Sequence, residues 1–278
     1  MRAGAPGCVM ARGFLNLCNR LLNVAVGLAL LVMGLYAGYA LWDNGQIYSA
    51  AENVRTDMLL YKPKLAEEGE AGPTLDELRA INPDVRAWLT LDNTMIDYPV
   101  VQGATNFTYL NTDVYGNFSL AGSIFADTRC DPNFQDRYTL IHGHHMAERR
   151  MFGDLDLYKD QEFFKENRTG TLILEDRIYS LVTIACLVAA ANDDVIFSPE
   201  RWADDIEEPL RYARAAAMHY DDAMITRLLE ENELAAGGGR TPQILVLATC
   251  SSEYTDARTI LLAEMQDYVP ANREDEGL

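Results

Sequence analysis

The strongest constraint on this chain is an apolar stretch of 22 residues near its N-terminus, from Leu21 to Trp42. The stretch contains no charged residue and only one side-chain amide, that of Asn23. A helix of this length rises about 30 Å, which matches the hydrocarbon thickness of a bilayer. We therefore predict a transmembrane anchor over residues 21–42, with any folded domain lying outside the membrane.

The charges on either side of this stretch predict its orientation. Residues 1–20 contain three arginines and no acid, whereas Asp43 follows the stretch directly. By the positive-inside rule, residues 1–20 form a cytoplasmic basic N-terminus, and the chain crosses the cell membrane once with residues 43–278 extracellular. The alternative is a cleaved signal peptide, because Gly38-Tyr39-Ala40 resembles a processing site. The stretch is longer than a usual signal core, which favours an anchor.

Composition excludes one class of function. The 278 residues are 49% hydrophobic and 23% charged, as in ordinary globular proteins, and the formal net charge is −19. Without residues 1–20, the chain has 20 basic against 42 acidic residues. A domain this acidic repels the phosphate backbone of nucleic acids. We therefore expect no nucleic-acid partner. Acidity of this kind is typical of a solvated protein surface. The alternative explanation is that clusters of acidic residues bind Ca²⁺.

The cysteines indicate a reactive thiol rather than a disulfide framework. Of five cysteines, two precede the anchor and three follow it, namely Cys130, Cys186 and Cys250. An odd number in an oxidising compartment leaves at least one unpaired. Cys186 lies within a strand-like run and is interpreted as a small core residue. Cys250 instead ends an apolar run and precedes polar residues.

Beyond the anchor, the pattern indicates a stalk and one β-rich domain. Residues 43–73 form the stalk or linker, helical over 43–65, and residues 74–278 form the domain, which opens with a capping box at Thr74 and Glu77. Short apolar runs predict strands at 87–91, 95–101, 123–125, 138–141, 171–175, 178–188, 243–249 and 258–263. Helical runs are predicted around Phe163 and Phe164 and over 199–230, the latter comprising 207–220 and 221–233. A mainly β barrel with helical excursions accounts for this order.

Cys250 and Arg258 are the first candidate pair. Cys250 ends the strand 243–249, and Arg258 begins the next strand after the loop 251–257. If the two strands are antiparallel neighbours, the two residues face each other at one rim. A guanidinium beside a thiol favours the thiolate and can donate hydrogen bonds to an oxyanion. The alternative is a solvated arginine and a core thiol, and these two residues alone do not decide.

His144 is the third candidate. It follows the strand 138–141, and we expect Gly143 to let the backbone turn sharply there. One alternative is a zinc site formed by His142 and His144 with His219 or a carboxylate, and another is a set of satisfied turn histidines. Adjacent histidines diverge on a strand and the chain has no Cys-x-x-Cys pair, which argues against zinc.

The motifs in order resemble class B sortases over roughly residues 74–265. The matching motifs are Ile96-Asp97-Tyr98-Pro99-Val100-Val101-Gln102, Asn106, Tyr109-Leu110, Gly122-Ser123-Ile124-Phe125-Ala126-Asp127, Gly143-His144-His145-Met146, Met151-Phe152-Gly153-Asp154-Leu155, Thr249-Cys250 and Arg258. The resemblance implies an eight-stranded sortase-type β-barrel with N-terminal helices and a helical insertion before the seventh strand. It also implies a membrane-anchored cysteine transpeptidase of the Gram-positive cell wall that needs no metal or organic cofactor.

The resemblance also assigns roles. Cys250 corresponds to the nucleophile, His144 to the acid/base and Arg258 to the group that stabilises substrate and oxyanion. The positions that correspond to the substrate groove are Asn106, Leu110, Thr249 and Ser251. Two residues depart from the family pattern, because Ala248 stands where serine is frequent and His142 where tyrosine is frequent. Both lie beside the groove, so they affect the substrate motif more than the chemistry.

The expected partners follow from the same resemblance. Sortases cleave a sorting motif near the C-terminus of secreted proteins through a thioacyl-enzyme, and an amine acceptor, on a peptidoglycan precursor or a pilin lysine, then resolves it. Two alternatives remain: an extracellular Cys/His hydrolase, and an inactive membrane-anchored binding domain. The intact Cys250, His144 and Arg258 argue against the inactive domain.

Overall fold

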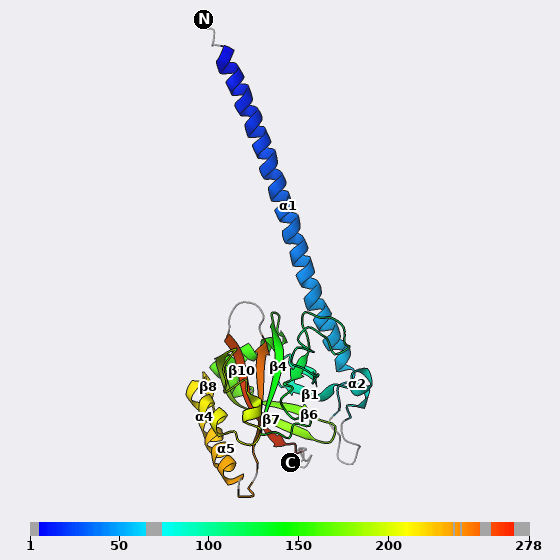
Figure 1. The fold of residues 1–278 in the computed structure, drawn as a ribbon, viewed down its shortest axis with the longest axis vertical. Helices are drawn as coiled ribbons and strands as arrows, with labels where there is room; N and C mark the ends of the chain where they lie inside the picture. Colours follow the sequence, from blue (N-terminus) through cyan, green and yellow to red (C-terminus); the bar gives the residue numbers. More distant parts are fainter. Residues whose placement is uncertain (1–5, 65–73, 236, 240, 251–256, 270–278) are drawn as a thin grey trace, which may run out of the picture. The chain divides into compact units, whose positions relative to one another are not determined.

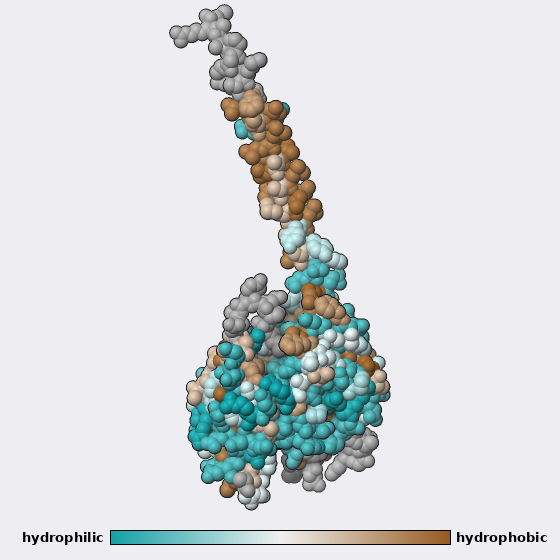
Figure 2. Space-filling model, in the orientation of Figure 1, coloured by the Kyte–Doolittle hydropathy of each residue, from teal (hydrophilic) through white to brown (hydrophobic). Residues whose placement is uncertain are grey.

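The computed structural model describes residues 6–64, 74–235, 237–239, 241–250 and 257–269 (Figure 1). The chain divides into two compact units, Met1–Ser49 and Ala50–Leu278. The first unit consists of the greater part of helix α1 (Pro6–Leu59). Figure 2 shows the apolar side chains of this helix as a continuous brown band. In length and composition α1 is sufficient to cross a membrane, and it contains the predicted anchor.

The second unit contains the remaining elements. Its helices are α2 (Asp76–Ile81), α3 (Gln161–Glu166), α4 (Glu207–Ala216) and α5 (Asp222–Ala235), with 3₁₀ helices η1 (Gly153–Lys159) and η2 (Pro199–Arg201). Its strands are β1 (Val85–Leu91), β2 (Asp97–Val101), β3 (Ile124–Ala126), β4 (Tyr138–Met146), β5 (Arg150–Met151), β6 (Thr169–Ile173), β7 (Ile178–Ala190), β8 (His219–Tyr220), β9 (Gln243–Cys250) and β10 (Ala257–Asp267).

Eight of these strands close into a barrel. Their order is β10-β9-β4-β3-β2-β1-β6-β7, and β7 pairs with β10 to complete the ring. The pairs β2–β3 and β4–β9 are parallel, and the other pairs in the ring are antiparallel. Along the sequence, helices α4 and α5 lie between β7 and β9, which are the sixth and seventh of these eight strands in chain order. The eight-stranded barrel and its helical insertion are therefore confirmed.

Strand alternation divides the side chains of the barrel wall between two apolar clusters. Ile141, Leu247 and Leu261 belong to a cluster that draws on all eight strands and fills the barrel interior. Their neighbours Leu140 and Ala248 belong to a second cluster, which α4 and α5 cover from outside. Successive residues of one strand point to opposite faces, so this division fixes the face of each later residue on β4, β9 and β10.

Two details differ from the sequence-based expectation. The helix predicted over 207–220 ends at Ala216, because His219 and Tyr220 instead pair with Cys186 and Ala185 at the edge of β7. In the predicted stalk, Met58 is buried in a third cluster with residues of α2 and β1.

An ion pair attaches α5 to the barrel wall. The carboxylate of Glu264 on β10 is fully buried, and Arg227 of α5 donates to both its oxygens, at 3.1 and 2.5 Å. Removing one partner of a buried pair leaves a charge without compensation. We expect Arg227→Met to lower the free energy of unfolding by about 3 kcal/mol, near the lower end for such pairs because Arg227 is partly exposed.

Urea unfolding of the Arg227→Met variant measures this loss. Arg211→Met is the matched control, because Arg211 pairs with Glu207 on the surface of α4 and should lose less than about 1 kcal/mol. Equal losses for the two variants would contradict a structural role for the buried pair.

Candidate active site

The candidate residues come together on three neighbouring strands. In the parallel pair β4–β9, His144 lies in register with Cys250. In the antiparallel pair β9–β10, Ile260 lies opposite Ala248, so the same register continued by two residues sets Arg258 opposite Cys250. Positions 144, 250 and 258 therefore meet at one end of adjacent strands, although more than 100 residues of sequence separate the first from the others.

Alternation places the three positions on one face of the sheet. Leu140, Ala248 and Ile260 point into the cluster outside the barrel. Positions 144, 250 and 258 differ from them by even numbers of residues and fall on that same face. The backbone of the barrel thus brings these three positions together, as a Cys/His/Arg site requires.

A backbone carbonyl orients His144. Its Nε2 lies 2.7 Å from the carbonyl oxygen of Leu110, in the loop between β2 and β3. A carbonyl only accepts hydrogen bonds, so Nε2 carries a proton and donates it. Any proton transfer by this imidazole then involves Nδ1.

A second polar network lies beside this site and is centred on Asp127. The carboxylate is fully buried; Asn106 donates to Oδ2 at 2.8 Å and His142 donates to the same oxygen at 3.0 Å. Arg129 donates to both carboxylate oxygens, each at 2.9 Å. The ring of His142 lies 5.1 Å from that of Phe125. The network therefore fixes two residues singled out from the sequence, Asn106 and His142.

The charges of this network set the ionisation of Asp127. Burial alone would raise the pKa of its carboxyl, but hydrogen bonds from Arg129 and His142 outweigh it and hold the pKa well below its usual range. A carboxyl with a lowered folded-state pKa contributes stability above its unfolded pKa, near 4, and loses it as the pH falls through the lowered value.

We expect Asp127→Asn to reduce the free energy of unfolding by about 3 kcal/mol at pH 7. The loss should shrink below about pH 4, because there the unfolded chain binds a proton at this carboxyl while the native carboxylate, with its lowered pKa, stays ionised. Urea unfolding at pH 7 and pH 3 measures both effects. Asp176→Asn is the control, since Asp176 pairs with Arg177 on the surface. An equal loss at both pH values would contradict this assignment.

The four expected groove positions have different surroundings. The oxygen of the Asn106 amide accepts from the backbone of Thr128 at 2.8 Å, and the Leu110 carbonyl accepts from His144. Thr249 is buried, and its hydroxyl accepts from the backbone N–H of Thr259 at 3.0 Å. Ser251 lies outside the described residues.

The expected sharp turn at Gly143 is wrong. Strand β4 continues through it to Met146 and does not end at Ile141. A Cβ at Gly143 would lie 2.4 Å from Ile124 Cδ1 and 2.7 Å from Phe152 Cδ2. Glycine is therefore needed for close packing inside the barrel, and the straight strand carries His144 into register with β9.

Two of the three cysteines that follow the anchor are core residues. Cys130 and Cys186 are buried, and burial raises the pKa of each thiol to about 12. Thiols of such high pKa are poor nucleophiles at neutral pH. The interpretation of Cys186 as a core residue is confirmed.

The histidines of the zinc alternative take part in separate hydrogen bonds. His142 donates to Asp127, His144 to Leu110, and His219 to the carbonyl of Lys159 at 2.8 Å. Within the described part of the chain, no group of three or more His, Cys, Asp or Glu residues has the arrangement of a metal site.

Two carboxylates of this region, those of Asp127 and Asp156, have no role that was predicted from the sequence. Asp127 follows strand β3 directly, the strand-end position at which His144 was noticed. Asp156 lies in η1, where the sequence shows only an alternation of acidic and apolar residues. The position of Asp127 directly after a strand could have pointed to it from the sequence, whereas no such feature singled out Asp156.

Comparison with known proteins identifies the family. No family model matches the chain. Sortase B of Staphylococcus aureus is 26% identical over 195 residues, covering 69% of this chain and 75% of that protein. Sortase B of Listeria monocytogenes is 32% identical over 148 residues, covering 51% and 60%.

A solved structure decides the matter. The crystal structure of a Streptococcus pyogenes class B sortase involved in pilus biogenesis is 32% identical with a TM-score of 0.59, and the match covers 69% of this chain and 97% of that one. This chain belongs to the class B sortases. A class B sortase is a cysteine transpeptidase, which cleaves a sorting motif and transfers the acyl portion of the cleaved protein. The predicted family, fold and activity are confirmed.

Proposed function

We propose that Cys250 is the nucleophile of this sortase, His144 its acid/base and Arg258 its oxyanion-stabilising group. The observation that carries the proposal is the strand register, which pairs His144 with Cys250 and aligns Arg258 opposite Cys250. A positively charged guanidinium beside a thiol favours the thiolate.

In the first half-reaction, the thiolate of Cys250 attacks the carbonyl carbon of a threonine in the sorting motif. The S–C bond forms, and Arg258 stabilises the negative charge on the oxygen. The C–N bond then breaks, and His144 gives the proton on Nδ1 to the leaving amine while Nε2 stays bonded to Leu110. The products are a thioacyl-enzyme and the released C-terminal fragment.

In the second half-reaction, an amine attacks the thioester. The new C–N bond forms, the C–S bond breaks, and neutral His144 takes the proton that the amine loses. Splitting the reaction through a covalent intermediate makes transfer possible in place of simple hydrolysis. The scheme returns Cys250 and His144 to their starting protonation states and requires no cofactor.

The partners follow from this scheme. The donor is a secreted protein with a C-terminal sorting motif, which lies along Asn106, Leu110, Thr249 and Ser251. The acceptor amine belongs to a peptidoglycan precursor or a pilin lysine, and the Streptococcus pyogenes relative, described as involved in pilus biogenesis, makes the pilin lysine worth testing.

The enzyme is held at the cell membrane by residues 21–42, with a cytoplasmic N-terminus and an extracellular catalytic domain over 74–278. The arginines before the apolar segment and Asp43 after it support this orientation. Tethering raises the concentration of the enzyme relative to other membrane-held partners.

The test uses full-length enzyme in detergent with a library of sorting pentapeptides, with and without an amine. We expect cleavage of a subset of peptides and an amide product when the amine is present. Hydrolysis at the same rate with no amide product would indicate a hydrolase. If no peptide is cleaved and a methanethiosulfonate reagent fails to label Cys250 in the folded protein, the site is inert.

A further inference from the structure

The residue next to each proposed catalytic position points to the opposite face of the sheet. These neighbours are His145 on β4, Thr249 on β9 and Thr259 on β10. Because strand residues alternate, fixing a side chain on one face also fixes the backbone that carries the adjacent side chain on the other. The contacts of these three neighbours therefore bear directly on the geometry of positions 144, 250 and 258.

One carboxylate connects all three neighbours. His145 Nε2 donates to Asp156 Oδ2 at 3.0 Å, and the hydroxyl of Thr259 donates to Asp156 Oδ1 at 2.7 Å. Thr259 in turn donates its backbone N–H to the hydroxyl of Thr249 at 3.0 Å. Asp156 thus reaches β4 and β10 directly and β9 through one intermediate. Its contacts lie within one concavity, which is also lined by Lys159 and Arg258.

The element that carries Asp156 is firmly held. On either side of it in η1, Leu155 is fully buried in the barrel-interior cluster, as is Tyr158. Lys159 pairs with the same carboxylate at 2.6 Å. Burial would raise the pKa of Asp156, but hydrogen bonds from Lys159, Thr259 and His145 outweigh it and lower the pKa. The carboxylate is therefore ionised at neutral pH and accepts from all three.

We propose that Asp156 is a positioning residue for the transpeptidase reaction, which aligns positions 144, 250 and 258 by holding their neighbours on the opposite face of the sheet. The inference rests on the proposed roles of Cys250, His144 and Arg258. Asp156 hydrogen-bonds to His145 and Thr259, whose positions alternate with 144 and 258 along their strands. Its effect on rate comes from alignment, and misplacement of reacting groups by about 1 Å costs up to roughly 10²-fold.

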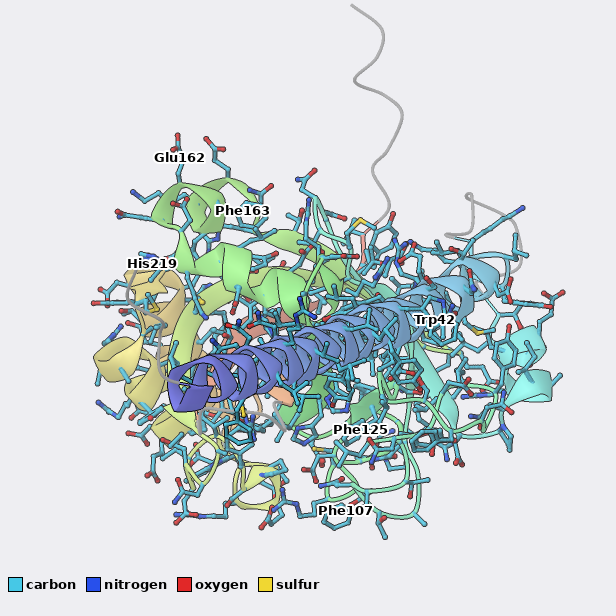
Figure 3. All side chains as sticks on the ribbon, turned by 90° about the horizontal axis from the view of Figure 1, so that it is seen from above. Trp42, Phe107, Phe125, Glu162, Phe163 and His219 are labelled. Carbon is cyan, nitrogen blue, oxygen red and sulfur yellow. The ribbon has the colours of Figure 1, made fainter. Side chains whose placement is uncertain are left out.

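The first test compares Asp156→Ala with Glu162→Ala in full-length enzyme in detergent, with rates expressed per reactive thiol. Glu162 is an exposed acid of the neighbouring helix α3, and its side chain points away from the barrel in Figure 3. We expect kcat for amide formation to fall roughly 10–100-fold in Asp156→Ala, with KM within twofold, and neither to change in Glu162→Ala. A kcat within twofold of the control, or a rise in KM alone, would overturn the proposal.

The second test asks whether the effect passes through Thr259. Thr259→Val removes the hydroxyl and keeps the shape, whereas Thr259→Ser keeps the hydroxyl. We expect Val to lower kcat severalfold and Ser to retain it. The double variant Asp156→Ala/Thr259→Val should be no slower than Asp156→Ala alone, because both break one linkage. Multiplicative losses would show that the two residues act separately.

The third test needs no substrate: the pH profile of Cys250 alkylation, with the labelled residue identified by peptide mass spectrometry. Loss of a nearby negative charge would by itself lower the pKa of the thiol, whereas loss of alignment with His144 and Arg258 raises it. We expect the profile of Asp156→Ala to move to higher pH. A shift to lower pH, or none, would overturn the positioning role. Alkylation reports the alignment of Cys250 even if the enzyme cleaves no peptide. A lack of peptide cleavage would therefore count against the proposed function, whereas an unshifted alkylation profile would count against this inference.

Discussion

Cys250→Ala is expected to reduce both peptide cleavage and amide transfer to background, a loss on the order of 10⁴-fold or more. The physical reason is that the reaction passes through a covalent thioester, which needs a thiolate at the end of β9. The buried thiols of Cys130 and Cys186 have pKa values raised to about 12, so neither replaces it. Steady-state assays and intact-protein mass spectrometry measure turnover and thioester formation together.

Cys186→Ala is the matched control, because it removes a sulfur atom from the barrel interior and leaves the site unchanged. We expect this variant to lose some stability and to keep kcat within about twofold. Residual transfer by Cys250→Ala above a hundredth of the native rate would mean that the nucleophile lies elsewhere.

The second large effect is expected at His144. His144→Ala should lower kcat roughly 10²–10⁴-fold, because it removes the general acid that protonates the leaving amine. His145→Ala should be much milder, up to about tenfold, since His145 faces the other side of the sheet and acts only through Asp156. Parallel kcat measurements on the two variants decide between adjacent histidines. If His145→Ala were the inactive variant, our choice of acid/base would be wrong.

From the strand pattern of the sequence, Cys250 and Arg258 were expected to face each other if strands 243–249 and 258–263 were antiparallel neighbours. They flank a short connection between two apolar runs, and consecutive strands commonly pair. The helical insertion was equally visible, because Ala, Glu, Arg and Leu are concentrated over residues 199–230. Local composition and strand periodicity carry this kind of information.

The approach of His144 to Cys250 could not be derived in this way. It depends on the parallel pairing of β4 with β9, strands that are far apart in sequence, and only the family resemblance indicated it. The register in turn depends on Gly143, which was misinterpreted as a turn residue. Its requirement is steric, and the sequence does not reveal that Ile124 and Phe152 approach it from other elements.

Networks of polar side chains were the least predictable feature. Asp127 and Asp156 each accept hydrogen bonds from residues on other elements of the fold. Asp127 is distinguished only by its position directly after a strand, and nothing in its local sequence distinguishes Asp156 from the many acids of a chain with 42 Asp and Glu residues. Their roles arise from tertiary contacts, so they become visible only when the barrel is closed.

The central claim is that a thiol, an imidazole and a guanidinium meet at one end of three adjacent strands and perform acyl transfer. The most direct measurement is intact-mass and peptide mass spectrometry of the full-length enzyme incubated with a cleavable sorting peptide. We predict an acyl adduct on the peptide that contains Cys250, which disappears with formation of an amide when an amine is added. An adduct on any other residue, or cleavage of the peptide with no adduct that an amine can resolve, would contradict the account.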